Sequence, residues 1–387
     1  MTTLFIQPDR IITPGRALEN HAVVVSDGLI AELAPTHEVA CPPGATRVEA
    51  EGLTLAPGFI DLQLNGAFGH DFTTDPASIW EVARLLPMYG VTSFLPTIIT
   101  SPAETMAQAQ EAWLQGPPPG FLGAAPLGLH LEGPFLNPAR LGAHNSVYLR
   151  PPDLSAIESW SPEQGVRLVT LAPELPGSEA LIAALRERGV VISTGHSMAT
   201  FEQASRAFDL GVSYATHLFN AMPPLDHREP GLAGAILAHP GVTASLIADG
   251  IHIHPAMLSI AWRLKGPHKL NLVTDAMAAL GMPPGRYLLG DREVISDGTS
   301  ARHDDGRLAG SLLSLDRAVR NLIAFTGCSP QEAIMTVTEV PTSVLGIERQ
   351  RGRIAPGHIA DLVLLTPDLQ VVSTILGGEL IKVIGSR

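Results

Sequence analysis

Apolar runs recur through the middle of the chain with the length and spacing of buried strands. Segments between most of these runs carry apolar residues at helical spacing, as at 178–188, 200–210 and 255–265. This alternation predicts strands joined by helices. The eight expected strands are 59–64, 93–99, 127–132, 167–173, 190–196, 213–218, 243–249 and 270–275.

Strands that alternate with helices predict a parallel sheet, because parallel neighbours need a crossover connection. Eight such units favour an α/β protein built on a closed (β/α)8 TIM barrel, with an open doubly wound sheet as the alternative. No strand is followed by G-x-G-x-x-G or G-x-x-x-x-G-K-[ST], which weakens the nucleotide-binding form of the open sheet. Further helices are expected at 311–325 and 330–338.

Both ends of the chain instead show short strands and turns. Ser26-Asp27-Gly28 follows an apolar run and indicates a hairpin, and Leu376-Gly377-Gly378-Glu379 indicates a turn between two strands. We expect the two ends to form one small β domain, comprising residues 1–56 and 345–387. The barrel domain, residues 57–344, would then be inserted between them.

Composition narrows the class of protein. The chain has 387 residues, of which 45% are hydrophobic, so a large core is expected. A net charge of −13 without a basic run argues against nucleic acid and against anionic membranes as partners. No run approaches the ~20 apolar residues of a membrane span, and the start lacks a signal-peptide pattern, so we expect a cytoplasmic protein. Cys41 and Cys328 are expected to be free thiols.

Residues able to bind metal or transfer protons stand at the ends of several predicted strands. Glu132 ends the third, His196 the fifth, His217 the sixth and Asp275 the eighth. Taken singly, each has an ordinary explanation as a capping or core residue. Their recurrence at the same end favours an active site, because the carboxyl ends of barrel strands meet at one mouth.

One carboxylate, two imidazoles and a water form a familiar open zinc site. We therefore expect one divalent ion per subunit, Zn²⁺, held by Glu132, His196 and His217. Such an ion lowers the pKa of bound water toward ~7 and polarises a carbonyl group. Asp275 is then free to take a proton and to pass it to a leaving nitrogen.

Many metal hydrolases carry His-x-His at the end of the first strand, which supplies two ligands. Gln63 and Asn65 occupy these positions here, so a second tightly held metal is not expected. Their amides remain able to hydrogen-bond a water or a ligand.

The substrate side is indicated by a polar, proline-rich segment after the sixth strand. Asn220 and the backbone N–H of Ala221 offer donors, and Arg228 suits a phosphate or a carboxylate. An arginine in such a loop is also commonly just solvated. His144 and His252 are further polar candidates near the mouth.

These residues lie in stretches that resemble the N-acetylglucosamine-6-phosphate deacetylase family of the amidohydrolase superfamily. The matching stretches run in order along nearly the whole chain: APGFIDLQLNG, GLHLEGPFLNPARLGAH, STGHS, ATHLFNAM, REPGLAGAIL, ADGIHIHP, LVTDAM, LAGS and GRIAPGHIADLVLL. The resemblance implies a barrel with a small β-sandwich built from both termini. It also implies a homodimer that hydrolyses the acetamide of an amino-sugar phosphate.

The resemblance assigns roles residue by residue. It implies Glu132, His196 and His217 as metal ligands, Asp275 as the catalytic acid and base, and Gln63 and Asn65 as marks of a branch with one metal. The implied substrate contacts are Ala143, His144, Asn220, Ala221, Arg228, Asp249, His252, Leu308, Ala309 and Gly310.

Other functions stay open at the level of sequence. The galactosamine epimer or another N-acyl amino sugar is a close alternative substrate. Ring hydrolysis or deamination is a different reaction type within the superfamily, although Arg228 and Asn220 argue against a neutral heterocycle. A non-catalytic assembly protein is a third class, which the retention of all three ligands and Asp275 disfavours.

Overall fold

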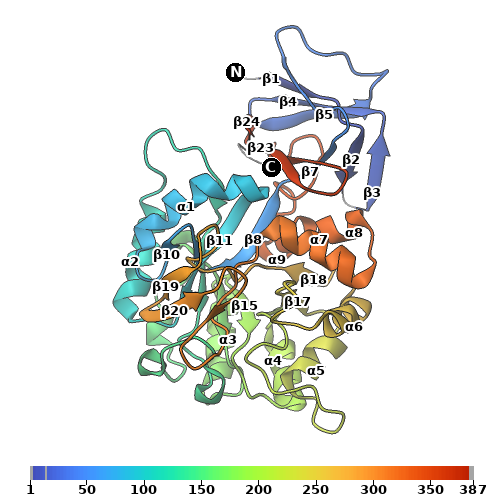
Figure 1. Cartoon of the computed structure of the whole chain (residues 1–387). Helices are drawn as coiled ribbons and strands as arrows, with labels where there is room; N and C mark the ends of the chain where they lie inside the picture. Colours follow the sequence, from blue (N-terminus) through green and yellow to red (C-terminus); the bar gives the residue numbers. More distant parts are fainter. Residues whose placement is uncertain (1–2, 14, 383–387) are drawn as a thin grey trace.

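The computed structural model describes residues 3–13 and 15–382, and its centre is a barrel of parallel strands (Figure 1). The backbone N–H of Asp275 donates to the Gln63 carbonyl at 2.8 Å, and that of Asn65 donates to the Ala276 carbonyl at 2.8 Å. These bonds join the last strand region to the first, so the barrel is confirmed over the open sheet. The strands in neighbouring order are β8 (Phe59–Leu64), β11 (Val91–Ile99), β13 (Leu129–Glu132), β14 (Val166–Leu171), β15 (Val191–Thr194), β16 (Tyr214–Ala215), β17 (Thr243–Leu246) and β18 (Leu270–Leu272), with the short β12 (Ala125–Pro126) beside β11.

Most strands end earlier than the apolar pattern predicts. The sixth is expected at 213–218 but β16 covers only Tyr214–Ala215, and the eighth is expected at 270–275 but β18 ends at Leu272. The backbone leaves the extended conformation before the polar residues that follow, as the positive φ angles of His217 (32°) and Asp275 (49°) show. The apolar pattern locates the strands, whereas their carboxyl ends are shaped by the site.

Helices surround the barrel, and the predicted helices at 178–188, 200–210 and 255–265 are confirmed. Helix α5 is buried on every side, so it has no polar face and no amphipathic signal in the sequence. Helix α7 begins at Leu315 rather than at 311 because Ser311 forms a β-bridge with Ala276. The helices are α1 (Ile79–Leu85), α2 (Ala103–Leu114), α3 (Ser178–Glu187), α4 (Phe201–Leu210), α5 (Gly231–Ala238), α6 (Pro255–Lys265), α7 (Leu315–Thr326), α8 (Pro330–Met335) and α9 (Glu339–Leu345).

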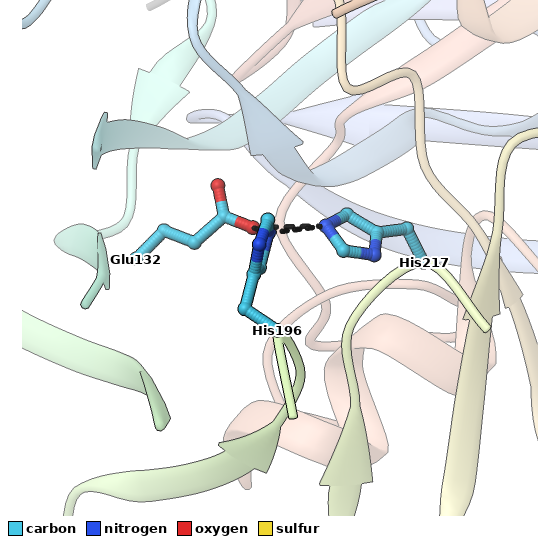
Figure 2. Close-up of side chains that lie close together, drawn as sticks. All are labelled: Glu132, His196 and His217. Atoms are coloured by element: carbon cyan, nitrogen blue, oxygen red, sulfur yellow. Dashed lines mark hydrogen bonds and ion pairs between the residues drawn. The ribbon is translucent and has the colours of Figure 1, made fainter. Parts of the chain in front are cut away.

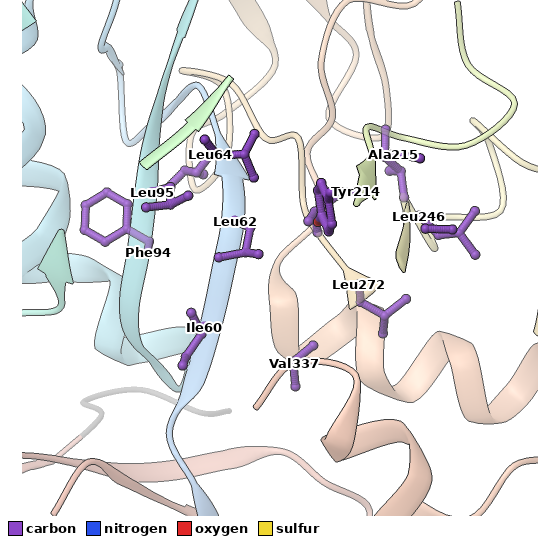
Figure 3. Packing of buried hydrophobic residues seen from close by; sticks show 14 of the residues in the cluster. Ile60, Leu62, Leu64, Phe94, Leu95, Tyr214, Ala215, Leu246, Leu272 and Val337 are labelled. Carbon is purple, nitrogen blue, oxygen red and sulfur yellow. The ribbon is translucent and has the colours of Figure 1, made fainter. Parts of the chain in front are cut away.

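The barrel core is packed from both faces of its strands, as a sheet covered by helices requires. Every residue of β8 and of β11 is buried. Figure 3 shows this packing, with side chains of the first two strands on one side and those of β16, β17 and β18 on the other. The labelled residues are Ile60, Leu62, Leu64, Phe94, Leu95, Tyr214, Ala215, Leu246, Leu272 and Val337.

Strands from both ends of the chain form two further sheets at one end of the molecule (Figure 1). Strand β7 pairs with β2 and with β22, so one sheet joins the beginning and the end of the chain. The hairpins predicted at Ser26–Gly28 and at Gly377-Gly378 are confirmed. The exact division at residues 56 and 345 stays a prediction. One sheet holds β24 (Glu379–Lys382), β23 (Val371–Leu376), β22 (Leu362–Leu365), β7 (Thr54–Pro57), β2 (Arg10–Thr13) and β3 (Arg16–Glu19), and the other β5 (Leu29–Pro35), β4 (His21–Ser26), β1 (Thr3–Ile6) and β6 (Thr46–Val48).

A small antiparallel sheet between β18 and α7 is not foreseen from the sequence. It contains β19 (Gly285–Leu289), β20 (Arg292–Ser296) and β21 (Ala301–Arg302). Its buried residues pack with Ile99 and Met277, which follow or end barrel strands. The β19–β21 sheet therefore covers part of the barrel mouth.

Cys41 and Cys328 are free, as expected. Among the helices of the described ranges, none combines the length and the apolar character that crossing a bilayer demands.

Candidate metal centre and active site

The predicted site residues meet at the carboxyl end of the barrel. Glu132 is the last residue of β13, His196 and His217 follow β15 and β16 by two residues, and Asp275 follows β18 by three. Gln63 lies on β8 itself. Residues separated by up to 212 positions are thus in hydrogen-bond contact.

Three of these residues have positive φ angles, which is uncommon outside glycine. The values are 49° for His196, 32° for His217 and 49° for Asp275, and Ala221 at 52° adds a fourth near the same mouth. Such conformations cost of order 1–3 kcal/mol each and gather at functional sites. The surrounding packing must hold them, which indicates that side-chain direction here is under constraint.

Glu132, His196 and His217 point at one another (Figure 2). Glu132 Oε1 lies 3.0 Å from Nε2 of His196 and 3.0 Å from Nε2 of His217, and the two Nε2 atoms are 3.0 Å apart. All three side chains are almost fully buried. Within residues 3–13 and 15–382, no other group of three His, Cys, Asp or Glu side chains converges in this way.

This arrangement fits a metal ion. Ligand atoms around a tetrahedral zinc with bonds of ~2.0–2.1 Å lie roughly 3.3 Å apart, close to the observed spacing. Nδ1 of His196 is 2.8 Å from the Arg140 carbonyl and donates to it, so the lone pair of that ring is on Nε2, facing the centre. Two imidazoles and a carboxylate therefore offer a ready set of donors for one divalent ion.

Gln63 and Asn65 hold the carboxylates of the site. The Gln63 amide donates to Glu132 Oε1 at 3.3 Å and to Asp275 Oδ1 at 3.1 Å, and the Asn65 amide donates to Asp275 Oδ1 at 2.7 Å. These residues replace a pair of metal ligands with a pair of hydrogen-bond donors. Asp275 is consequently fixed through one oxygen, and Oδ2 is the oxygen left for chemistry.

Burial and mutual interaction shift the pKa values of the centre. Burial raises the pKa of Asp275 to about 6, and the nearby charge of Glu132 adds to the rise. Burial alone would also raise the pKa of Glu132, but the close imidazoles of His196 and His217 outweigh it and hold that pKa well below its usual value. A divalent cation at the centre would favour the ionised form of both carboxylates further.

One further histidine, His144, is oriented by a neutral partner, Thr100. Thr100 donates its backbone N–H to Nδ1 of His144 at 3.2 Å, so the His144 proton is on Nε2, which lies 3.7 Å from Glu132 Oε2. Burial, and then the proximity of His196, lower the pKa of His144 to about 3. His144 is thus a neutral donor that faces the centre.

These residues line a cavity of about 130 Å³. The predicted residues in its wall are Asn65, Glu132, Ala143, His144, His196, His217, Asn220, Ala221, His252, Asp275, Leu308 and Gly310. The sequence therefore located most of the wall. The volume is below the ~300 Å³ of a small ligand pocket, so the cavity has room for only part of a ligand of ordinary size.

Four predicted site residues are not in the cavity wall. Gln63 lies behind it and acts on Glu132 and Asp275, and Ala309 is buried beside two residues that do line it. Asp249 accepts a hydrogen bond from Nδ1 of His252 at 2.6 Å, so it orients that imidazole. Arg228 is exposed in the loop that follows Asn220 and Ala221.

The sequence missed three residues of the wall: Ile99, Gly142 and Leu289. Ile99 ends a predicted strand, as the predicted metal ligand Glu132 does, and this position was its signal. Leu289 belongs to the unforeseen β19–β21 sheet and carried no local signal.

The barrel, the Glu-His-His centre and the adjacent Asp275 define a hydrolase of the amidohydrolase type. The model of the amidohydrolase family matches residues 54–381. The chain belongs to the amidohydrolase family.

Comparison with individual members of this family gives a more specific resemblance. The chain is 37% identical to N-acetylglucosamine-6-phosphate deacetylase of Bacillus subtilis (strain 168), over 98% of this chain and 97% of that one. It is 36% identical to N-acetylgalactosamine-6-phosphate deacetylase of Escherichia coli O157:H7, over 98% and 99% of the two chains. A mutant N-acetyl-D-glucosamine-6-phosphate deacetylase of Mycobacterium smegmatis, solved in complex with N-acetyl-D-glucosamine-6-phosphate, superposes with a TM-score of 0.90 at 32% identity, covering 98% of this chain and 99% of that chain. The resemblance inferred from the sequence motifs is confirmed.

The metal centre predicts the metal content. With one Glu and two His ligands, and with amides at positions 63 and 65, purified protein should hold close to one tight divalent ion per chain. His196→Asn and His217→Asn should each lose that ion, as measured by elemental analysis after gel filtration. His303→Asn, a buried histidine outside the cavity, is the matched control and should keep it. Two tightly held ions per chain would contradict the prediction.

Proposed function

We propose that this protein is a metal-dependent deacetylase that converts N-acetyl-D-glucosamine 6-phosphate and water to D-glucosamine 6-phosphate and acetate. The observation that carries the proposal is the buried Glu132-His196-His217 centre beside Asp275 in one cavity. Relatives that match over nearly the whole chain are named for this activity. Their names supply the substrate, and the geometry of this chain supplies the chemistry.

A divalent ion held by Glu132, His196 and His217 would polarise the acetamide carbonyl and lower the pKa of water. We take the ion to be Zn²⁺, because two imidazoles, one carboxylate and an open position form a typical catalytic zinc site. Asp275 accepts the proton of the attacking water on Oδ2, while its Oδ1 is held by Gln63 and Asn65. The same proton then passes to the departing nitrogen, without which the amine is a poor leaving group.

The pKa of Asp275 suits this double role. With no ion at the centre, burial raises it to about 6, and a bound divalent cation would counteract part of that rise. A carboxylate with a raised pKa binds a transferred proton more tightly than an exposed aspartate does. General acid–base catalysis is most effective when the pKa lies near the working pH.

The remaining polar groups of the wall bind and orient the sugar. His144 offers Nε2–H beside the metal ligands, where the carbonyl oxygen develops negative charge. His252, held by Asp249, and the side chain of Asn220 face the same cavity and suit sugar hydroxyl groups. The backbone N–H of Ala221 is a further donor. The phosphate end extends out of the small cavity toward the loop that carries Arg228.

The setting of the enzyme follows from this proposal. A sugar phosphate is strongly charged and does not cross a bilayer unaided, so we place the protein in the cytoplasm with its substrate. We also propose that it is a homodimer, which rests on the family resemblance alone.

N-acetylgalactosamine 6-phosphate is a second candidate substrate. A relative named for that activity is 36% identical over 98% of this chain, against 37% over 98% for one named for the glucosamine substrate. Identity of this size does not separate the two epimers. Ring hydrolysis fits less well because Arg228 and Asn220 argue against a neutral heterocycle as substrate. A purely structural role fits less well because it requires neither the ligand set nor Asp275.

A panel of substrates tests the proposal. We expect acetate release from N-acetylglucosamine 6-phosphate to exceed that from unphosphorylated N-acetylglucosamine by at least about 10-fold in kcat/KM, and to exceed that from the galactosamine epimer. Acetate is measured by a coupled assay after addition of Zn²⁺. Faster release from the galactosamine epimer would establish the second candidate. Absence of release from both phosphates in metal-loaded protein would refute the proposed class of substrate.

Arg228 is expected to bind the phosphate. Arg228→Ala removes a charge-assisted contact worth about 1.5–3 kcal/mol, which corresponds to an increase in KM of roughly 10- to 150-fold for the phosphorylated sugar. The unphosphorylated sugar should be affected much less. Arg263→Ala, another arginine outside the cavity wall, is the control. An unchanged preference for the phosphorylated sugar would show that Arg228 does not bind the phosphate and is simply solvated.

Asp275→Asn keeps the size and one hydrogen-bond acceptor of the side chain but removes the proton acceptor. We expect kcat to fall by ~10²–10⁴-fold, the usual scale of general acid–base catalysis, with metal content retained. Asp249→Asn, which alters the partner of His252 instead, should act mainly on KM. If Asp275→Asn worked within a few-fold of wild type while Asp249→Asn was inactive, the assignment of the acid and base would be wrong.

A further inference from the structure

The cavity is lined by two chemically different kinds of side chain. His144, Asn220 and His252 are polar, whereas Ile99, Leu289 and Leu308 are apolar, and Ile99 and Leu289 pack in one cluster. An N-acylated sugar has the same division, since the sugar carries hydroxyl groups and the acyl chain ends in a hydrocarbon. The apolar side chains therefore match the acyl end of the substrate.

Ile99 lies directly beside the metal centre. It is the last residue of β11, and in the β-sheet register its partner on β13 is Glu132. Paired residues on neighbouring strands project to the same face of a sheet. The Ile99 side chain is thus next to the carboxylate that helps hold the metal, where the reacting carbonyl must be. The carbonyl carbon of an amide carries two groups, the nitrogen on the sugar side and the acyl carbon. The acyl carbon is the apolar one, so it is the group that an apolar side chain at this position suits.

Leu289 comes from the β19–β21 sheet and packs in one cluster with Ile99. Both side chains are nearly inaccessible, with 4% of Ile99 and 2% of Leu289 exposed. The following residue, Gly290, has φ of +58°, and a Cβ there would come within 2.9 Å of the end of the Ile99 side chain. The backbone N–H of Gly290 donates to the buried Asp71 carboxylate at 3.1 Å. The turn behind Leu289 is therefore anchored, so these apolar side chains have little room to yield.

We propose that Ile99 and Leu289 form the wall that receives the acyl methyl group, and that they limit the substrates to short N-acyl groups such as formyl and acetyl. This inference rests on the proposed function, because it needs an N-acylated sugar in the cavity. The inference adds to that function by assigning acyl-chain selectivity to two residues that neither bind the metal nor transfer a proton.

The test compares acyl chains on one sugar phosphate. N-formyl, N-acetyl, N-propionyl and N-butyryl glucosamine 6-phosphate all release the same amine, which is measured directly. One methylene in a hydrophobic site changes kcat/KM by roughly 10- to 200-fold. Wild type should therefore prefer acetyl over butyryl by at least about 10-fold. Ile99→Ala and Leu289→Ala should each reduce that preference by about 10-fold or more, chiefly through faster turnover of the longer chains.

Leu288→Ala is the matched control. Leu288 precedes Leu289 on β19 but is 47% exposed. The Leu288→Ala variant therefore shortens the same kind of side chain on the opposite face of the strand. It should leave the acyl preference as in wild type. Metal content and Tm are measured for each variant. If either alanine variant does not fold, Ile99→Val or Leu289→Val replaces it. The expected reduction of the preference is then smaller, about 4-fold, because only one methylene is removed from the wall.

The outcomes separate this inference from the function beneath it. If wild type releases no amine from any acylated sugar phosphate, the proposed function fails. If wild type deacetylates but the acetyl-to-butyryl preference stays within 2-fold of wild type in folded, metal-loaded variants at both positions, the assignment of the acyl wall is overturned. An equal change in Leu288→Ala would overturn it as well.

Discussion

The buried carboxylate of Glu132 is the feature on which the rest of the site depends. A charge removed from water is costly unless it is paired and hydrogen-bonded. Here two imidazoles and the Gln63 amide converge on one oxygen of Glu132. The two imidazole Nε2 atoms and the carboxylate together form a buried group that suits a cation. Asp275, His144 and the cavity wall are all arranged around that group.

The closure of the barrel and the chemistry of the site share the same residues. The Gln63 carbonyl accepts the backbone N–H of Asp275, and the Gln63 side chain donates to the Asp275 carboxylate. Asn65 likewise combines a backbone bond to Ala276 with a side-chain bond to Asp275. The residues that hydrogen-bond the first strand to the last therefore also hold Asp275, the proposed acid and base, in place. At these two positions the chain has amide side chains that position a carboxylate.

The mouth of the barrel brings together parts with unlike chemistry. The ends of the barrel strands and the loops after them supply metal ligands and polar donors. The β19–β21 sheet contributes an apolar side chain, Leu289, that meets Ile99 over the centre. Polar and apolar side chains therefore line one cavity beside the Glu-His-His centre, and Arg228 is exposed outside that cavity.

The sequence by itself determined the barrel and the candidate ligand set. Alternating apolar runs and helical segments specify parallel strands, and topology then brings every carboxyl strand end to one mouth, so Glu132, His196, His217 and Asp275 could be grouped without contact information. Tertiary structure alone decided that Gln63 and Asn65 hold Asp275, that Asp249 supports His252, and that Leu289 reaches the cavity. These contacts join segments up to 212 residues apart in the sequence, and the local pattern of apolar residues does not predict them.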